Sequence, residues 1–336
     1  MSRLSRLFSH REFGVAFLIF ACAGIVGFFN HAFLSVGNIR DILVQCAPAA
    51  IVACGMTLVI VMGEIDISVG SMMGLLAAVL GILTSTQRMG LPVGVGVAIT
   101  LALGSALGLV NGLLVTYGRV PSIIVTLGML TVLRGVTEIL MGGEWISGMP
   151  SGLRFLGSGS VAGIPACLIA AAVVIVAFII LATNTRLGRR IYAVGGNEEA
   201  ARLAGLPVRR LKILVFVLTG FLTAVAMLVS ATQLSVIESG IGGGFELLVV
   251  TCVMVGGAST SGGIGTIAGS VLGAILLGMI RTELIFLKLG PASTYWERAI
   301  QGAFILLAVL ADHVGRRRGD PCDRPGRIQD SPLHRA

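Results

Sequence analysis

Two acidic residues stand in a short polar segment between two long apolar runs of the chain. Glu64 and Asp66 follow Gly63 in this segment, and Ser68 and Ser71 are the next hydroxyl side chains along the sequence. A carboxylate at membrane depth is costly unless it is paired or faces water, so it marks a candidate pathway for a solute or an ion. Glycine-interrupted backbone at that depth must be buried in protein or line a cavity. The alternative interpretation is an ordinary turn with solvated carboxylates.

A second candidate is a pair of opposite charges inside a later apolar run. Arg134 and Glu138 are four residues apart, a spacing that places both side chains on one face of a helix. Charged groups inside a membrane span usually face the bundle interior and pair with one another. The spacing favours a structural ion pair between Arg134 and Glu138. A position facing the translocation path is the competing interpretation.

A third candidate is a polar segment near the middle of the chain. Asn197 is a good N-cap, acidic side chains follow in the first turn, and Gly205 and Pro207 suit the end of a helix. The pattern predicts a two-turn helix. A helix this short is marginal on its own in water, so something must hold it, either the rest of its loop or a docking partner. The residues of this candidate docking site are Asn197, Glu198, Glu199, Ala200, Ala201, Arg202, Leu203 and Gly205.

Several kinds of chemistry are not indicated. The six cysteines form no CxxC pair, and the four histidines lie near the two ends of the chain, so we expect no catalytic site, no metal and no cofactor. An intramembrane enzyme is therefore the least favoured class. The only lysines are Lys212 and Lys288, and neither follows a glycine. A phosphate-binding loop of the Walker A type needs Gly-Lys-Ser/Thr, so the chain lacks that route to ATP hydrolysis.

The elements that position these residues are predicted to be membrane-spanning helices. Of the 336 residues, 55% are hydrophobic and 12% are charged, whereas a soluble domain carries about 25% charged residues. A length of roughly 20 residues per span allows about ten spans. The composition thus indicates an all-α polytopic integral membrane bundle. The predicted spans are 13–33, 42–62, 69–84, 91–115, 122–141, 164–183, 213–236, 245–255, 266–286 and 296–310.

The basic residues give the expected orientation. Arginines precede the first span, crowd the connection 184–212 and follow the last span, and this clustering in alternate connections is typical of cytoplasmic segments. Both termini are therefore predicted to be cytoplasmic. The expected divisions are an N-terminal segment 1–12, a transmembrane domain 13–312 and a disordered cytoplasmic tail 313–336. The net charge of +8 does not indicate nucleic-acid binding, since no polar segment is long enough to build a basic face.

Small residues spaced four apart predict close helix packing. Gly104 and Gly108 form one such pair, and Gly269 and Gly273 form another. This spacing lets helix backbones approach closely in lipid. We interpret both pairs as packing seams and not as parts of a pore.

Four segments, taken in order, resemble one known family. They are GEIDISVGS (63–71), VPSIIVTLGMLTVLRG (120–135), LGRRIYAVGGNEEAARLAGLPV (187–208) and GGASTSGGIGTIAGSVLGA (256–274). Together they resemble the ribose-type family of ABC importer permeases, which includes permeases for ribose, rhamnose and autoinducer-2. The similarity extends from about Asn38 to Asp312. The outer segment GGEWISGMP (142–150) is most similar to the autoinducer-2 and rhamnose branch.

The resemblance implies an assembly in the bacterial inner membrane. Its expected members are a second permease copy or paralogue, cytoplasmic ABC ATPase subunits and a periplasmic sugar-binding protein. The helix at 197–205 would match the coupling helix that docks on the ATPase, and the segment 64–71 would match a glycine-acid motif near the translocation path. Glu64 stands where many members of the family have a small residue. The chain would then move a sugar or sugar-like solute by alternating access, with no covalent chemistry of its own.

A competing hypothesis of another class is an ion-coupled secondary transporter. Glu64 and Asp66 would form its proton or sodium site. The capped helix at 197–205 discriminates between the two, because a secondary transporter needs no docking element there.

Overall fold

The computed structural model describes residues 10–233, 236–287, 296–297, 299–307 and 310. Within these residues the fold is almost entirely helical, and seven helices are long and apolar enough to cross a membrane. The predicted all-α membrane class is therefore confirmed. The seven are α1 (His10–Phe29), α2 (Val36–Val61), α4 (Val93–Gly118), α5 (Ser122–Met141), α7 (Ala166–Asn184), α10 (Val208–Ala231) and α12 (Ile267–Phe286).

The remaining elements are shorter. Two of them are apolar helices, α3 (Val69–Thr84) and α11 (Phe245–Val255). The others are η2 (His31–Leu34), α6 (Ser151–Ser158), α8 (Arg186–Gly196), α9 (Glu198–Leu203), and the strands β1 (Ser160–Val161) and β2 (Ile164–Pro165), which pair antiparallel. Residues 299–307 are also helical.

The predicted spans can be compared with these helices one by one. Nine predicted spans coincide with helices, although α3 and α11 are short, and the tenth, 296–310, is only partly described. The first helix ends at Phe29, where Asn30 caps η2 by accepting a hydrogen bond from the N–H of Ala32. The segment 1–12 lies mostly outside the described residues, and the tail 313–336 lies wholly outside them.

The connection between the sixth and seventh predicted spans differs from the prediction. Besides the predicted short helix, α9, it contains a further helix, α8, and the next span, α10, already begins at Val208. Lys212 therefore belongs to α10. Its side chain is thus carried by a long helix of the bundle, close to where that helix begins.

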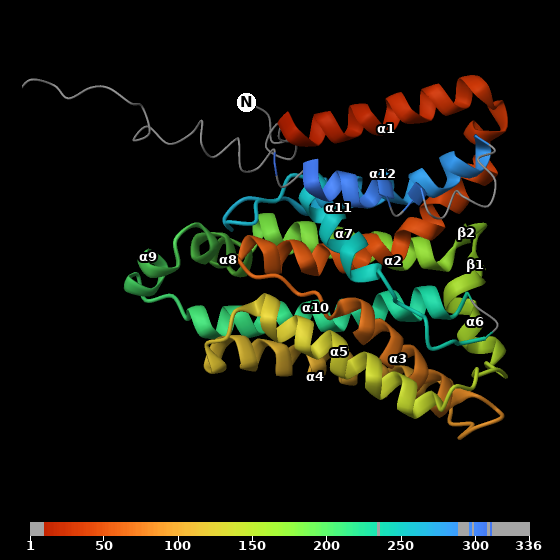
Figure 1. Ribbon diagram of the computed structural model, residues 1–336, viewed down its shortest axis with the longest axis horizontal. Coiled ribbons are helices and arrows are strands. Elements are labelled where there is room, and N and C mark those ends of the chain that lie inside the picture. Colours follow the sequence, from red (N-terminus) through yellow and green to blue (C-terminus); the bar gives the residue numbers. More distant parts are fainter. Residues whose placement is uncertain (1–9, 234–235, 288–295, 298, 308–309, 311–336) are drawn as a thin grey trace, which may run out of the picture.

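The centre of the bundle is α2. Its membrane-length window is 89% buried, against 17% for α5, so α2 is surrounded by protein whereas α5 lies at the periphery. Helices α7, α10, α11 and α12 pack around α2. In Figure 1 the long helices run side by side, and α8 and α9 lie together at the same end of the bundle as the start of α1. We call this end the basic end, because it carries the exposed arginines of α8, which are Arg186, Arg189 and Arg190.

Glycines set the closest helix contacts. A Cβ added at Gly108 would lie 2.3 Å from the carbonyl oxygen of Phe216, and one added at Gly220 would lie 2.2 Å from that of Gly104. On the other seam, a Cβ at Gly273 would lie 2.1 Å from the carbonyl oxygen of Cys252. The interpretation of both glycine pairs as packing seams is thus confirmed: α4 packs on α10, and α12 packs on α11.

Two of the helices begin within the bundle. Helix α3 follows the break at residues 62–68, and α11 follows the glycine segment 240–244. Figure 1 shows both short helices starting part of the way along their long neighbours. The two beginnings touch, because a Cβ added at Gly242 would lie 2.1 Å from the carbonyl oxygen of Gly70. Such discontinuous helices occur where backbone is buried in protein or lines a cavity.

Candidate coupling site at the basic end

Helix α9 has the caps that its sequence predicts. The side chain of Asn197 accepts a hydrogen bond from the N–H of Ala200 at 2.9 Å, with the extended backbone of an N-cap. Gly205 has a φ of +80°, a left-handed conformation suited to glycine, and the N–H of Leu206 returns to the carbonyl of Ala201 at 3.0 Å. The predicted short helix is therefore present, and its bounds are Glu198–Leu203.

Most side chains of α9 are exposed to solvent. Ala201 is its buried residue, whereas Leu203 is 83% exposed. Arg202 lies 3.9 Å from Glu199, and both side chains are largely exposed, so this pair adds little stability. A short helix that presents an apolar side chain and charges to solvent has the character of a contact surface.

Helix α8 is amphipathic and anchors α9 to the bundle. Thr185 caps it by accepting a hydrogen bond from the N–H of Gly188 at 3.1 Å. Ile191 and Val194 are buried, and the arginines of α8 are exposed. The burial of this apolar stripe holds α8 against the bundle, and α9 follows it after the single residue Asn197.

The end of α8 makes backbone contact with the end of α2. A Cβ added at Gly195 would lie 1.7 Å from the carbonyl oxygen of Val61, so only glycine fits there. The same carbonyl accepts a hydrogen bond from the N–H of Gly263 at 2.8 Å. Three segments distant in sequence therefore meet at one carbonyl: α8, the end of α2 and the glycine-rich turn 256–265.

A tyrosine provides a second tie between α8 and that turn. The hydroxyl of Tyr192 donates a hydrogen bond to the carbonyl of Gly265 at 2.7 Å. Burial, together with the nearby carboxylate of Glu12, raises the pKa of Tyr192 to about 12. The phenol is therefore a stable donor at neutral pH. Glu12 in turn accepts a hydrogen bond from the hydroxyl of Thr266, the N-cap of α12.

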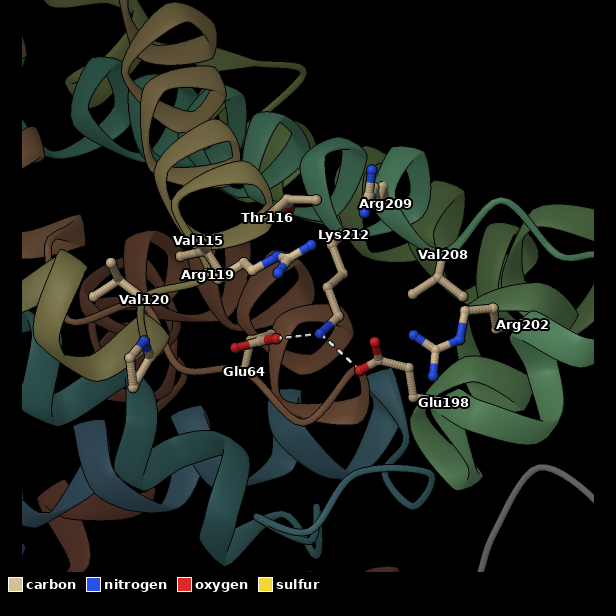
Figure 2. A pocket seen from close by; sticks show the side chains of 11 residues that line it. Glu64, Val115, Thr116, Arg119, Val120, Glu198, Arg202, Val208, Arg209 and Lys212 are labelled. Carbon is tan, nitrogen blue, oxygen red and sulfur yellow. Dashed lines mark hydrogen bonds and ion pairs between the residues drawn. The ribbon is translucent and has the colours of Figure 1, made fainter.

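Lys212 connects α9 with the break before α3. Its ammonium nitrogen Nζ lies 2.7 Å from Oε1 of Glu64 and 2.9 Å from Oε2 of Glu198. Figure 2 shows the lysine between the two carboxylates. Lys212 and Glu64 are 15% and 13% exposed, so this pair is much less screened than the surface pairs of the chain. The role of Lys212 was not predicted, because 148 residues separate it from Glu64.

This cluster lines an open cavity of about 570 Å³. Four cationic side chains and two carboxylates face it, and both carboxylates are paired with Lys212. Arg119 has a φ of 55°, an uncommon conformation for a residue with a side chain, at the end of α4. The guanidinium of Arg209 lies 5.7 Å from the centre of the Tyr117 ring. The residues that line the cavity are Glu64, Val115, Thr116, Arg119, Val120, Pro121, Glu198, Arg202, Val208, Arg209 and Lys212.

The two acids of the break face different surroundings. Glu64 faces the cavity, whereas Asp66 is fully buried and accepts hydrogen bonds from the N–H of Ser68 at 2.9 Å and from its hydroxyl at 2.6 Å. Asn111 of α4 donates to the Ser68 hydroxyl at 2.8 Å. Ser71 is buried in the first turn of α3. The structure thus brings Asp66, Ser68 and Asn111 together and places Glu64 in a separate cluster.

The ion pair expected between Arg134 and Glu138 is not formed. Arg134 donates hydrogen bonds to the carbonyls of Ser239 at 2.9 Å and Ile241 at 3.2 Å, and Glu138 is exposed. Among the described residues no ion pair joins Arg134 to Glu138. The two carbonyls before α11 are strong acceptors within reach of the Arg134 guanidinium, and they occupy its N–H donors. The carboxylate of Glu138 is exposed to solvent instead. The expected pair is therefore replaced by a contact from α5 to the segment before α11.

The fold and the site define the class of the protein: an integral membrane bundle with broken helices and an outward-facing helix at its basic end. Residues 38–309 match the model of the family described as branched-chain amino acid transport system / permease component. The chain belongs to this family.

Individual relatives are similar over most of the chain. The ribose import permease protein RbsC of Escherichia coli is 38% identical over 293 residues, which cover 86% of this chain and 89% of the relative. The autoinducer 2 import system permease protein LsrC of Photorhabdus laumondii is 34% identical, with coverage of 90% and 89%. The L-arabinose ABC transporter permease protein AraH of Azospirillum brasilense is 38% identical, with coverage of 85% and 83%. No solved structure matches.

Proposed function

We propose that the chain is the membrane permease subunit of an ATP-driven importer of a sugar or sugar-like solute of the ribose, rhamnose or autoinducer-2 class. The observation that carries this proposal is helix α9, which is capped at both ends, outward-facing and tied to the bundle through Lys212. Family membership and the names of the relatives support it. A permease of this kind is a transport subunit and not an enzyme, so its energy comes from a separate ATPase.

The proposed assembly has both termini and α9 in the cytoplasm, with ten spans in each permease copy. The start of α1 lies at the same end as α8 and α9, which supports this orientation (Figure 1). The exposed arginines of α8 add the positive charge expected of a cytoplasmic segment. Two ATPase subunits would dock on α9 of two permease copies, and a periplasmic binding protein would deliver the solute to the opposite end. The exposed apolar faces of α4, α5 and α7 would lie against lipid or the second copy.

The proposed mechanism is alternating access. ATP-driven closure of the docked subunits would displace α9, and α8, which contacts the end of α2 through Gly195 and the carbonyl of Val61, would hold α9 beside the bundle during this movement. The path candidates are Glu64, Asp66, Ser68, Ser71, Arg134 and Glu138. Residues 64–71 lie at the start of the discontinuous helix α3, and Arg134 of α5 binds the segment before the other discontinuous helix, α11. Discontinuous helices are the segments that typically form the solute site of a transporter.

An ion-coupled transporter is not favoured. A proton or sodium site built from Glu64 and Asp66 would need the two carboxylates to converge. Instead Glu64 is paired with Lys212, and Asp66 accepts its hydrogen bonds from Ser68 and Asn111. The names of the relatives point to import permeases.

The solute class rests on relatives and needs a direct test. The family description names branched-chain amino acids, whereas the relatives are named for ribose, autoinducer 2 and L-arabinose. We expect uptake of at least one pentose, deoxyhexose or autoinducer-2, because the similarity to those relatives covers nearly the whole chain. A panel of ribose, rhamnose, arabinose, autoinducer-2 and leucine, offered to proteoliposomes of the complete complex, decides the class. Uptake of leucine alone would reject the sugar assignment.

Docking is tested by co-purification with the ATPase encoded beside this chain. The variant combines Glu199→Arg with Arg202→Glu, which retains opposite charges at the two positions but inverts the surface that α9 presents. Arg154→Glu on α6, at the other end of the bundle, is the control. We expect the wild type and the control to retain the ATPase and the double variant to lose it. If the wild type retains none in any detergent or nanodisc, the importer assignment fails.

A further inference from the structure

We propose that Lys212 is the positioning residue that transmits movement of α9 to the break before α3, so that without it the ATPase docks but does not drive the bundle. The inference rests on the proposed function and adds a specific residue to it. Lys212 touches neither solute nor ATP in this account; it acts by holding Glu198 and Glu64 together.

The first step runs from α9 to Lys212. Glu198 is the first residue of α9, and its carboxylate lies 2.9 Å from Nζ of Lys212. Ala201 is the only buried side chain of α9, so the ion pair of Glu198 is a principal side-chain tie between α9 and α10. A displacement of α9 would therefore pull on Lys212, whose own helix is packed along α4 and α2.

The second step runs from Lys212 into the break. Glu64 is bonded to Lys212, and the next residue, Ile65, donates its backbone N–H to the hydroxyl of Ser122 at 3.1 Å. Two residues beyond Glu64, Asp66 is held by Ser68, which also binds Asn111. The break is thus fastened to α5 and α4 at short intervals. Movement of Glu64 would therefore be transmitted to α5 and α4 through these hydrogen bonds, because the segment between them is not a flexible loop.

The third step runs from the break to the two discontinuous helices. Residues 62–68 lead directly into α3, whose first turn touches the segment before α11 at Gly70 and Gly242. That same segment accepts the hydrogen bonds of Arg134. Lys212 therefore stands at one end of a continuous set of contacts, and the starts of both short helices stand at the other.

Other cations near the cavity do not duplicate this arrangement. Arg119, Arg202 and Arg209 also face it, but the pairs recorded for Glu64 and Glu198 within the described residues both go to Lys212. Replacing Lys212 by an uncharged residue would leave Glu64 largely buried and without its cation. A part-buried charge that loses its partner rearranges or draws in water, which would detach the break from α9.

The experiment is hydrogen–deuterium exchange of the permease–ATPase complex in nanodiscs, without nucleotide and with ATP plus vanadate. This readout needs no knowledge of the solute. Two regions are compared: peptides over 196–206, which report docking, and peptides over 62–71, which report the break. The test variant is Lys212→Met, which keeps much of the side-chain length. Lys212→Arg keeps the charge, and Arg210→Met removes an exposed charge two residues away.

In the wild type we expect ATP to change exchange in both regions. In Lys212→Met the change over 196–206 should persist, while the change over 62–71 should fall about fivefold or more, the lower range of coupling between two sites. Lys212→Arg and Arg210→Met should behave as the wild type. An equal response of the break in Lys212→Met, or no response of the break in the wild type, would overturn the proposal.

A second variant covers the case in which Lys212→Met does not assemble. Glu64→Met removes both acceptor oxygens on the break side of the bridge and leaves the pair of Lys212 with Glu198. It should co-purify with the ATPase and lose the ATP response over 62–71. A wild-type response in Glu64→Met would reject the transmission role on its own. Failure of the wild type to bind any ATPase is a different result, since it would reject the proposed function and not this step alone.

Discussion

Lys212 and Glu64 form a part-buried ion pair with 2.7 Å between Nζ and Oε1, although 148 residues separate them along the chain. The pair joins the start of α10 to the break between α2 and α3. Glu198 completes it from α9. One lysine therefore ties the solvent-exposed helix α9 to the interruption between α2 and α3, which is the connection that the proposed coupling uses.

The contact of α8 with α2 predicts opposite results for two adjacent glycines. Gly195→Ala places a Cβ 1.7 Å from the carbonyl oxygen of Val61, whereas a Cβ at Gly196 meets nothing within 4 Å. We expect Gly195→Ala to destabilise the chain by about 1–3 kcal/mol, as overpacking does. Gly196→Ala should be neutral or slightly stabilising, because alanine is the better helix former. The melting temperatures of the two purified variants, measured in one detergent, test this expectation. Equal melting temperatures of Gly195→Ala and Gly196→Ala would contradict the tight contact between Gly195 and Val61.

The exposed apolar side chain of α9 predicts a docking defect without a folding defect. Leu203 is 83% exposed, so Leu203→Glu removes little contact within the chain. We expect nearly unchanged melting of the permease alone and at least about tenfold weaker ATPase binding, because a carboxylate buried in the interface without a partner is costly. Microscale thermophoresis with the labelled ATPase measures the affinity. Met89→Glu in the turn between α3 and α4, where the side chain is also exposed, is the comparison for a general effect of the charge. Equal binding by Leu203→Glu and the wild type would remove Leu203 from the interface.

Tyr192 predicts a pH dependence at high pH. Its hydroxyl donates to Gly265, and its pKa is raised to about 12, from an ordinary value of 10.0, by burial and by Glu12. A pKa raised in the folded state means that the stabilisation is complete below pH 10 and is lost as the pH rises toward 12. The difference in melting temperature between the wild type and Tyr192→Phe should therefore be constant up to pH 10 and shrink above it.

The size of that effect can also be stated. Below pH 10 Tyr192→Phe should cost about 1 kcal/mol, the net contribution of one hydrogen bond. If the difference in melting temperature between the wild type and Tyr192→Phe stayed constant from pH 9 to pH 11.5, the pKa of Tyr192 would not differ between the folded and unfolded chain.

The carbonyl contacts of Arg134 predict local loosening before α11. Arg134→Gln should raise hydrogen exchange over 238–246 while leaving α5 itself protected, because the guanidinium binds the carbonyls of Ser239 and Ile241. Glu138→Gln is the matched control, since Glu138 lies one turn away on the same helix and is exposed. Equal exchange in both variants would show that Arg134 does not order this segment.

Local signals were sufficient to predict part of the site. The caps of α9 depend on Asn197 and Gly205, whose preferences act within a few residues, and the helix forms where they indicate. The break at 62–68 was likewise marked by glycine and acidic residues between apolar runs. The seven membrane-length helices of the described residues followed from apolar length, which the bilayer imposes on each helix separately.

The contacts that join these parts were not predictable in the same way. Helix α8 ends in the pair Gly195 and Gly196, which reads as a loop in sequence; the close carbonyl of Val61, contributed by another helix, explains the first of them. Arg134 was expected to pair with Glu138 and binds backbone carbonyls far along the chain instead. The partners of Lys212 depend on where α10 begins, which only packing fixes. Pairing between distant segments is set by the tertiary fold and has no short-range signature.

The central claim, import driven by a separate ATPase, is tested most directly by transport in proteoliposomes. The permease, its ATPase and its binding protein are reconstituted with ATP enclosed on the ATPase side, and uptake of the solute selected by the sugar panel is followed. The account predicts uptake that requires ATP and the ATPase subunits and that continues when a protonophore and a sodium ionophore collapse the ion gradients. Uptake by the permease alone, driven by a proton or sodium gradient and abolished by the ionophore, would contradict it.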